Sequence, residues 1–178
     1  QLVPGGTLQE VNHRAADVPV PERDGRVLLA ALDAALDRGG HSPPTESSLR
    51  RRLGASSWGE MVCWMGARLA AALDYAHRRG VLHRDVKPAN VLLDAEGAPK
   101  LADFNISFCS KVEGASASAF FGGSLAYMSP EQLEAYNPSH DRLPDSIDGL
   151  SDIFSLGVLL WELVNGQRPW GEEAIVTA

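Results

Sequence analysis

Residues 83–90 bring an acid, a cation and an amide together in one short run. The run reads His-Arg-Asp-Val-Lys-Pro-Ala-Asn, so that Asp85, Lys87 and Asn90 lie within six positions. Pro88 lacks an amide hydrogen and disfavours a helical conformation of the residue before it, which predicts a loop here. Polar side chains on a loop between apolar segments are typical of a functional site.

A second acid, Asp103, follows the short apolar stretch 100–102. One carboxylate of such a pair can accept a proton from an attacking hydroxyl, whereas the other can bind a hard divalent cation such as Mg²⁺. This reading makes Asp85 the catalytic base. Asp103 and the amide oxygen of Asn90 would hold the metal, and Lys87 would stabilise the charge of a migrating phosphoryl group.

The order of these residues resembles that of eukaryotic-type protein kinases. Residues 83–90 and the Asp-Phe pair at 103–104 are similar to the catalytic loop and the metal loop of that family. Ser-Pro-Glu at 129–131 resembles its Ala-Pro-Glu motif, and residues 152–157 resemble the start of its buried helix. The lysine two places after the catalytic acid resembles the serine/threonine subclass. One motif alone is weak, but four in this order indicate the family.

The resemblance implies a mainly α fold, α+β overall, in which a protein-kinase-like C-lobe carries a small β-hairpin near the active site. Residues 1–178 would then form a partial protein kinase domain from which the N-lobe is absent. ATP would be the phosphoryl donor, Mg²⁺ the metal and proteins the substrates. Gln1 and Val3 would offer backbone groups to the adenine edge. Lys87 would also contact the nucleotide, and Leu92 would form the adenine floor or belong to the ordinary core.

Two longer segments are interpreted by the same resemblance. Residues 103–131 are similar to an activation segment, and polar and proline residues at 41–57 predict an insertion loop. Asn105 stands where the family has glycine, and Asn accepts left-handed backbone angles better than most residues. A phosphate on the activation segment could pair with Arg84. The serines considered for it are Ser110, Ser116 and Ser118.

Apolar spacing predicts the elements that position these residues. Residues 24–38 and 59–79 show a helical period, and residues 152–164 are apolar on nearly every face, which predicts a buried helix. Asp152 is expected to cap that helix and, by resemblance, to brace the catalytic loop.

Two short apolar stretches, 91–93 and 100–102, flank a turn-rich joint. They predict a hairpin that brings Asn90 and Asp103 together.

The composition is that of a globular chain. Among the 178 residues, 44% are hydrophobic and 22% are charged, and the net charge is −7. There is no long basic stripe and no apolar run of about 18 residues, so neither nucleic acid nor membrane contact is expected from this segment. The arginines at 50–52 are expected on the solvated surface.

The two cysteines, Cys63 and Cys109, lie far apart in the sequence without metal-ligand spacing. This favours reduced thiols and a cytoplasmic location, although a parent protein could be anchored to a membrane elsewhere. Cys63 falls within a helical pattern and is expected to be a small core residue.

The function expected from these residues is ATP-dependent phosphoryl transfer to Ser/Thr hydroxyls of proteins, as part of a larger kinase. This stretch alone is expected to be inactive. The main alternative is a pseudokinase that serves as a binding or scaffold module, and a phosphotransferase for small molecules is a third reading. The retained Asp85, Lys87, Asn90 and Asp103 favour catalysis over the pseudokinase.

Overall fold

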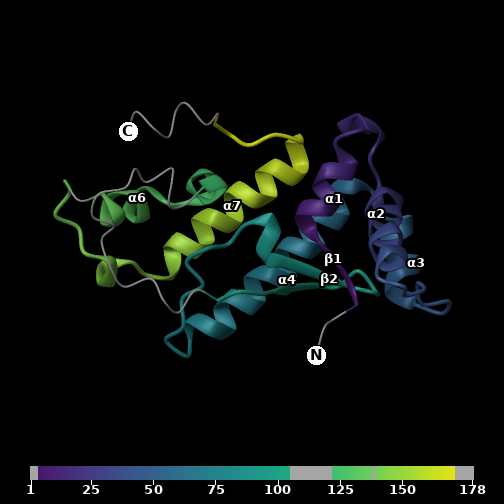
Figure 1. Ribbon diagram of the computed structural model, residues 1–178, viewed down its shortest axis with the longest axis horizontal. Coiled ribbons are helices and arrows are strands. Elements are labelled where there is room, and N and C mark those ends of the chain that lie inside the picture. Colours follow the sequence, from purple (N-terminus) through teal and green to yellow (C-terminus); the bar gives the residue numbers. More distant parts are fainter. Residues whose placement is uncertain (1–3, 105–121, 138, 171–178) are drawn as a thin grey trace.

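Helices form most of the chain that the structure describes, with one small sheet beside them (Figure 1). The structure is a computed structural model and describes residues 4–104, 122–137 and 139–170. Its helices of more than one turn are α1 (Leu8–Ala15), α2 (Gly25–Arg38), α3 (Ser48–Ala55), α4 (Trp58–His77), α6 (Pro130–Tyr136) and α7 (Gly149–Asn165). The strands are β1 (Gly5–Thr7), β2 (Val91–Asp94) and β3 (Pro99–Leu101). Short 3-10 turns are η1 (Val20–Glu22), η2 (Pro88–Asn90), η3 (Gly122–Tyr127) and η4 (Pro144–Ser146). This mainly α architecture confirms the predicted fold class.

The first two long helices begin at side-chain caps, as their sequences favour. The Asp24 carboxylate accepts a hydrogen bond from the amide of Arg26 at 2.8 Å and starts α2. Ser57 starts α4 through a capping box, in which the Glu60 carboxylate in turn accepts from the Ser57 amide at 2.8 Å. The helices predicted at 24–38 and 59–79 are therefore confirmed within two residues.

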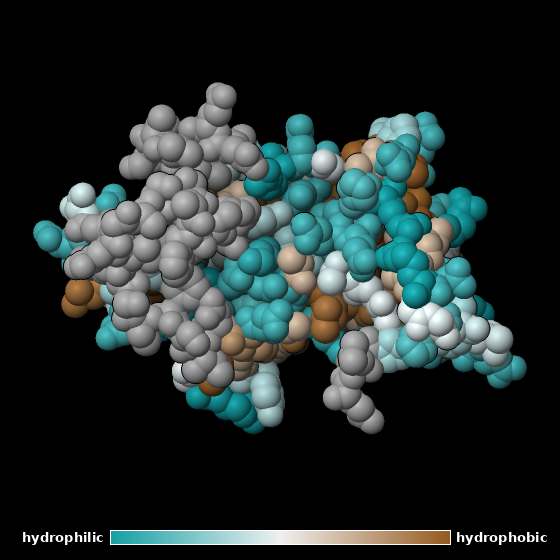
Figure 2. Space-filling model, in the orientation of Figure 1, coloured by the Kyte–Doolittle hydropathy of each residue, from teal (hydrophilic) through white to brown (hydrophobic). Residues whose placement is uncertain are grey.

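One large apolar core joins α1, α2, α3, β2, α4 and α7, and α4 and α7 pack against each other within it. α4 contributes Met65, Leu69 and Leu73, and α7 contributes Leu159 and Leu163; all five are fully buried. The Trp58 indole donates a hydrogen bond to the carbonyl of Leu163 at 2.7 Å, which ties the start of α4 to the end of α7. Hydrophilic side chains cover most of the described surface on the face shown in Figure 2.

The sheet is antiparallel in the order β1-β2-β3, and β2 and β3 form the predicted hairpin. Val91 faces Leu101 across it. The Asp94 carboxylate accepts hydrogen bonds from the amides of Glu96 and Ala98 at 3.1 and 3.0 Å and thereby closes the turn. Asx side chains favour such turns because they satisfy backbone amides locally.

The segment 41–57 is not a loop throughout. Its residues Ser48–Ala55 form α3, and the Ser47 hydroxyl caps this helix by accepting from the Arg50 amide at 3.0 Å. The loop prediction is wrong for this part, because the serine caps a helix that buries Leu53. That the segment is an insertion relative to the family stays a prediction.

Helix α7 differs from its prediction in its start and in its burial. Its N-cap is Asp148, whose carboxylate accepts from the Leu150 amide at 2.9 Å, so the prediction that Asp152 caps the helix is wrong. Only one face is buried. The exposed apolar side chains on α7 are Leu150, Ile153, Trp161 and Val164. A run of apolar residues did not distinguish a helix buried on one face from one buried all round.

Two surface expectations also fail. Cys63 is exposed on α4, because it lies off the stripe of buried residues that includes Val62 and Met65, and it is not a core residue. Arg50, expected on the solvated surface, has only 11% of its side chain exposed. Cys109 lies outside the described residues.

No helix among the described residues is long and apolar enough to cross a membrane.

The close approach of α2 to α3 yields a prediction about two helix-start glycines. A Cβ on Gly25 would lie 1.7 Å from the carbonyl oxygen of Leu53, whereas a Cβ on Gly59 meets nothing within 4 Å. Gly25→Ala is expected to destabilise the fold by about 2 kcal/mol or more, as overpacking against backbone does. Gly59→Ala should be neutral or stabilising by up to about 1 kcal/mol. Urea unfolding of both variants measures this, and equal effects would contradict the packing of α2 on α3.

Candidate active site

The polar residues of the predicted catalytic loop converge on the carboxylate of Asp85. The Lys87 ammonium lies 2.8 Å from Oδ2 of Asp85, and Nδ2 of Asn90 donates to the same oxygen at 2.9 Å. Nδ2 of Asn90 also donates to the Asp85 carbonyl at 2.8 Å. The Asp85 side chain is 20% exposed. The loop therefore holds the carboxylate in place while leaving it open to a reactant from solvent.

The backbone of this loop is held in an unusual conformation from two sides. Arg84 has a φ of 65°, in the left-handed region. Oδ1 of Asp152 accepts a hydrogen bond from the Arg84 amide at 2.6 Å, and Oδ2 accepts from the His83 amide at 2.8 Å. The Gln132 side chain donates to the Arg84 carbonyl at 3.0 Å. Such a backbone costs on the order of 1–3 kcal/mol and persists only where its surroundings hold it. The bracing role expected of Asp152 is confirmed.

His83 joins the loop to the stretch before Asp103. Its ring is fully buried, and Nε2 lies 2.9 Å from the carbonyl oxygen of Ala102, which can only accept, so Nε2 donates. Nδ1 accepts a long hydrogen bond from the Asp85 amide at 3.4 Å. The ring also contacts Phe104 with centroids 4.5 Å apart. Both nitrogens thus have the partners that a neutral ring requires. Burial lowers the pKa of His83 below its usual value. The nearby carboxylates of Asp152 and Asp85 act in the opposite direction and raise this pKa, but burial has the larger effect.

The hairpin brings Asn90 and Asp103 into neighbouring positions. The Ala102 amide donates to the Asn90 carbonyl at 2.9 Å, which extends the pairing of β2 with β3 by one step and leaves Asp103 directly beyond it. Asp103 is exposed and has a φ of 55°, a conformation that Asp tolerates better than most residues.

The donor chemistry at these positions fits Mg²⁺. Nδ2 of Asn90 is committed to Asp85, so the amide oxygen is the group left to bind a cation, and Asp103 offers an exposed carboxylate. Mg²⁺ prefers oxygen ligands and usually binds one or two protein carboxylates, with water and substrate phosphates completing its shell. No group of three or more His, Cys, Asp or Glu residues in the described part of the chain could form a metal site by itself.

The predicted nucleotide contacts are only partly described. Leu92 is half-buried, whereas Val91 and Leu93 on either side of it are fully buried in the core. Because side chains alternate along a strand, Leu92 faces away from that core. Its predicted role as an adenine floor stays a prediction. Gln1 and Val3 lie outside the described residues.

The predicted activation segment is described only at its two ends. Residues 105–121 lie outside the described residues, and with them Asn105, Ser110, Ser116 and Ser118. At the far end the Ser129 hydroxyl contacts that of Ser151 at 3.0 Å, and Ser151 donates to the Glu131 carboxylate at 3.0 Å. These contacts attach the Ser-Pro-Glu motif to α7.

Gln132 is a site-supporting residue that the sequence reasoning missed. It is fully buried, and its side-chain oxygen accepts from the Ser129 amide at 3.1 Å while its nitrogen reaches the Arg84 carbonyl. The spacing Ser-x-x-Gln before an apolar residue is a capping-box pattern and could have revealed the first of these contacts. The second contact spans 48 positions and has no local signal.

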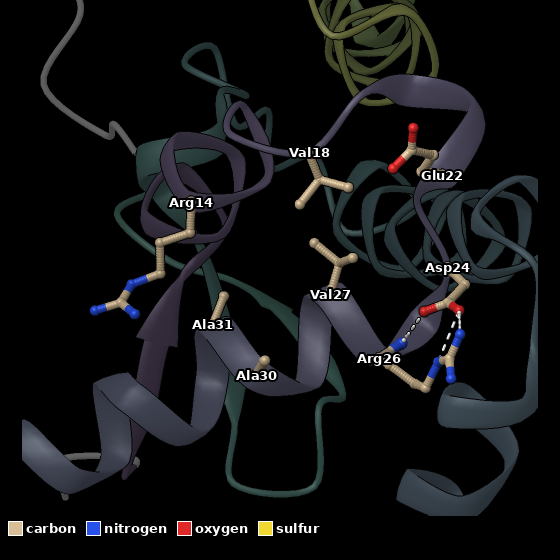
Figure 3. A pocket seen from close by; sticks show the side chains of 8 residues that line it. All are labelled: Arg14, Val18, Glu22, Asp24, Arg26, Val27, Ala30 and Ala31. Carbon is tan, nitrogen blue, oxygen red and sulfur yellow. Dashed lines mark hydrogen bonds and ion pairs between the residues drawn. The ribbon is translucent and has the colours of Figure 1, made fainter.

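An open pocket of roughly 390 Å³ lies between α1, η1 and the start of α2 (Figure 3). It is lined by Arg14, Val18, Glu22, Asp24, Arg26, Val27, Ala30 and Ala31. Val18 and Val27 point toward each other across it, and Asp24 already bonds Arg26 at 2.8 Å. It contains none of the predicted site residues, so we do not assign the reaction to it.

Comparison with known proteins identifies the family of this chain. Residues 49–177 match the family model described as the protein kinase domain. The serine/threonine-protein kinase PknK of Mycobacterium bovis is 38% identical over 141 residues, which cover 76% of this chain and 12% of PknK. The serine/threonine-protein kinase PknB of Mycobacterium tuberculosis is 37% identical over 108 residues, which cover 60% of this chain and 16% of PknB. The chain thus spans less than a fifth of the length of these curated relatives.

Asp152 and Asp148 offer a matched test of the loop brace. Asp152→Ala removes both acceptors from the amides of His83 and Arg84, and we expect it to cost about 3 kcal/mol or more because buried donors lose their partners. Asp148→Ala removes only an exposed cap and should cost about 1 kcal/mol. Urea unfolding measures both values. Hydrogen exchange at the two amides should accelerate in the first variant, beyond what its lower stability explains, and an unchanged rate would contradict the brace.

The neutral His83 ring predicts a dependence of stability on pH. Because burial lowers the pKa of His83 in the folded protein, the unfolded chain takes up the proton first as the pH falls. The ordinary pKa of histidine is 6.5. The neutral ring therefore contributes its full stabilisation at pH values above 6.5, and this contribution declines as the pH falls below 6.5. His83→Gln keeps a donor but does not titrate. The wild-type Tm should therefore fall more steeply than that of the variant between about pH 7.5 and about pH 5.5, and parallel curves would contradict this assignment.

Proposed function

This chain belongs to the protein kinase family, and we propose that its parent protein transfers the γ-phosphoryl group of ATP to Ser or Thr hydroxyls of protein substrates. The observation that carries the proposal is the convergence of Lys87 and Asn90 on the Asp85 carboxylate, on a loop braced by Asp152. The curated relatives are named serine/threonine-protein kinases, which agrees with a lysine two places after the acid.

Asp85 acts on the substrate hydroxyl in this proposal. It orients the hydroxyl and accepts its proton while the oxygen bonds to the γ-phosphorus and the bond from that phosphorus to the β–γ bridging oxygen breaks, which releases ADP. Lys87 lies beside the same carboxylate and offsets negative charge on the transferred group. Positioning and charge stabilisation supply most of the rate gain in phosphoryl transfer.

Asn90 and Asp103 complete the site on the phosphate side. The amide oxygen of Asn90 and the carboxylate of Asp103 would hold Mg²⁺, which supplies neutralisation of the phosphate charge when bound. The hydrogen bond from Asn90 to Asp85 joins the metal ligand to the base, so one loop orients both groups.

The adenine side is proposed from fewer contacts. Leu92 would form the floor beneath the adenine ring, in keeping with its half-buried position facing away from the core. Gln1 and Val3 would bind the adenine edge through their backbone groups, and Lys87 would approach the terminal phosphate.

Asp85→Asn in the complete parent protein tests the catalytic role. We expect kcat for transfer of labelled phosphate from ATP to a general protein substrate to fall by about 10²- to 10⁴-fold, the usual contribution of an acid–base group. Asp74→Asn, at an exposed position on α4, is the control and should leave kcat unchanged.

Nucleotide affinity is measured on the same variants, because it separates the alternatives. A kcat for Asp85→Asn equal to that of the wild type contradicts the role of Asp85 as base. A wild-type protein that binds ATP with Mg²⁺ but transfers nothing to any substrate would instead be a pseudokinase, a binding or scaffold module.

A further inference from the structure

Helices α2 and α3 pack together beside the sheet, and α2 also packs against β1 (Figure 1). The first residue of α2 touches the end of α3: the Gly25 amide donates to the Ser56 carbonyl at 3.0 Å, and Asp24 and Ser57 form an isolated β-bridge. None of the residues proposed for catalysis belongs to this pair of helices. Its contacts with the rest of the chain therefore indicate what it does.

Helix α2 supports the strand that leads from the proposed adenine edge. A Cβ on Gly6 of β1 would lie 2.9 Å from the Ala35 side chain, so α2 packs directly against the backbone of β1. At the end of α2, Arg38 pairs with Glu10 at 2.8 Å. Glu10 in turn accepts from the Thr7 amide at 2.9 Å, where β1 passes into α1.

Helix α3 supports the turn of the hairpin that carries Leu92. The Arg50 guanidinium donates to the carbonyl of Ala95 at 2.8 Å and pairs with Asp33 of α2. The Ser47 hydroxyl bonds to the carboxylate of Glu96 in the same turn. The Arg50 side chain is only 11% exposed, whereas that of Asp33 is 40% exposed, so water screens the Arg50–Asp33 pair from the Asp33 side only.

The two ends of β2 are thus held by different parts of the fold. At its start, Asn90 is fixed by Asp85 and by the Ala102 amide, in the loop that Asp152 braces. At its end, the turn at 94–97 is fixed by α3 through Arg50. Leu92 lies between these anchors and pairs with Thr7 of β1. A loss at the second anchor should displace the adenine floor more than the reacting groups.

We propose that Arg50 is a positioning residue for nucleotide binding. It joins α2, α3 and the hairpin turn, and so holds Leu92, the proposed adenine floor, in its position relative to β1, the strand with which it pairs. This inference rests on the proposed kinase function. It assigns to the 41–57 segment a role in ATP affinity and not in the phosphoryl-transfer step.

The test compares Arg50→Met with Arg51→Met in the complete parent protein. Both changes remove one positive charge from α3, but Arg51 is exposed. We expect the Kd for ATP and the KM for ATP to rise about 3- to 10-fold in Arg50→Met, on the order of 1 kcal/mol of lost positioning, with kcat within about twofold of wild type. Both constants should be unchanged in Arg51→Met.

A second variant keeps the test decisive if Arg50→Met does not fold. Asp33→Asn retains the shape of the partner and removes only its charge, and it should raise the Kd for ATP in the same direction by a smaller factor. A melting curve of each variant verifies that the protein is folded.

The outcomes separate this inference from the function on which it rests. Unchanged ATP affinity in folded Arg50→Met and Asp33→Asn, or an equal change in Arg51→Met, overturns the positioning role. A fall in kcat at constant KM also overturns it. A wild-type protein that neither binds ATP nor transfers phosphate overturns the proposed function itself, and this inference with it.

Discussion

The contact between Asp152 and the backbone of the catalytic loop is the constraint on which the site depends. Asp152 is 1% exposed, and its carboxylate oxygens accept from the amides of His83 and Arg84. Oδ2 also lies 2.7 Å from Nε2 of His77. A buried carboxylate is tolerated only where hydrogen bonds satisfy it. A residue with a left-handed backbone conformation, such as Arg84, persists only where its backbone is held. The loop amides give the Asp152 carboxylate the hydrogen bonds that its burial requires, and the carboxylate holds the backbone of Arg84 in its positive-φ conformation. The first turn of α7 and the loop therefore form one unit.

Buried polar contacts extend this unit to the segment around the Ser-Pro-Glu motif. Ser129 and Ser151 contact each other, Ser155 donates to the Tyr127 carbonyl at 2.7 Å, and Gln132 reaches back to Arg84. These serines and the glutamine are at most 3% exposed. A satisfied network of this kind is rigid, because any displacement leaves a polar group without a partner away from water. Residues of α6 and α7 therefore hold the backbone just before Asp85, through Gln132 and Asp152.

Local chemistry made a large part of this arrangement predictable from sequence. Helices and turns depend on contacts between residues a few positions apart, so a local pattern is enough to predict them. The structure contains the helices predicted at 24–38 and 59–79 and the hairpin predicted from 91–93 and 100–102. The motif at 83–90 also identified the groups that meet at Asp85. The run of apolar residues in α7 did not show how much of the helix would be buried, because a helix buried on one face and a helix buried on all faces can have the same apolar pattern.

What the sequence determined by itself was the family, because four motifs in a fixed order indicate it, and the polar groups that meet at Asp85, because their types and spacing belong to one short loop. The tertiary structure alone decided which other residues support them. Arg50 differs little from Arg51 in sequence, yet only Arg50 meets the hairpin turn, 45 positions away. Gln132 joins the catalytic loop across 48 positions. Such contacts depend on how helices pack, and packing is decided by the whole core and not by any local pattern.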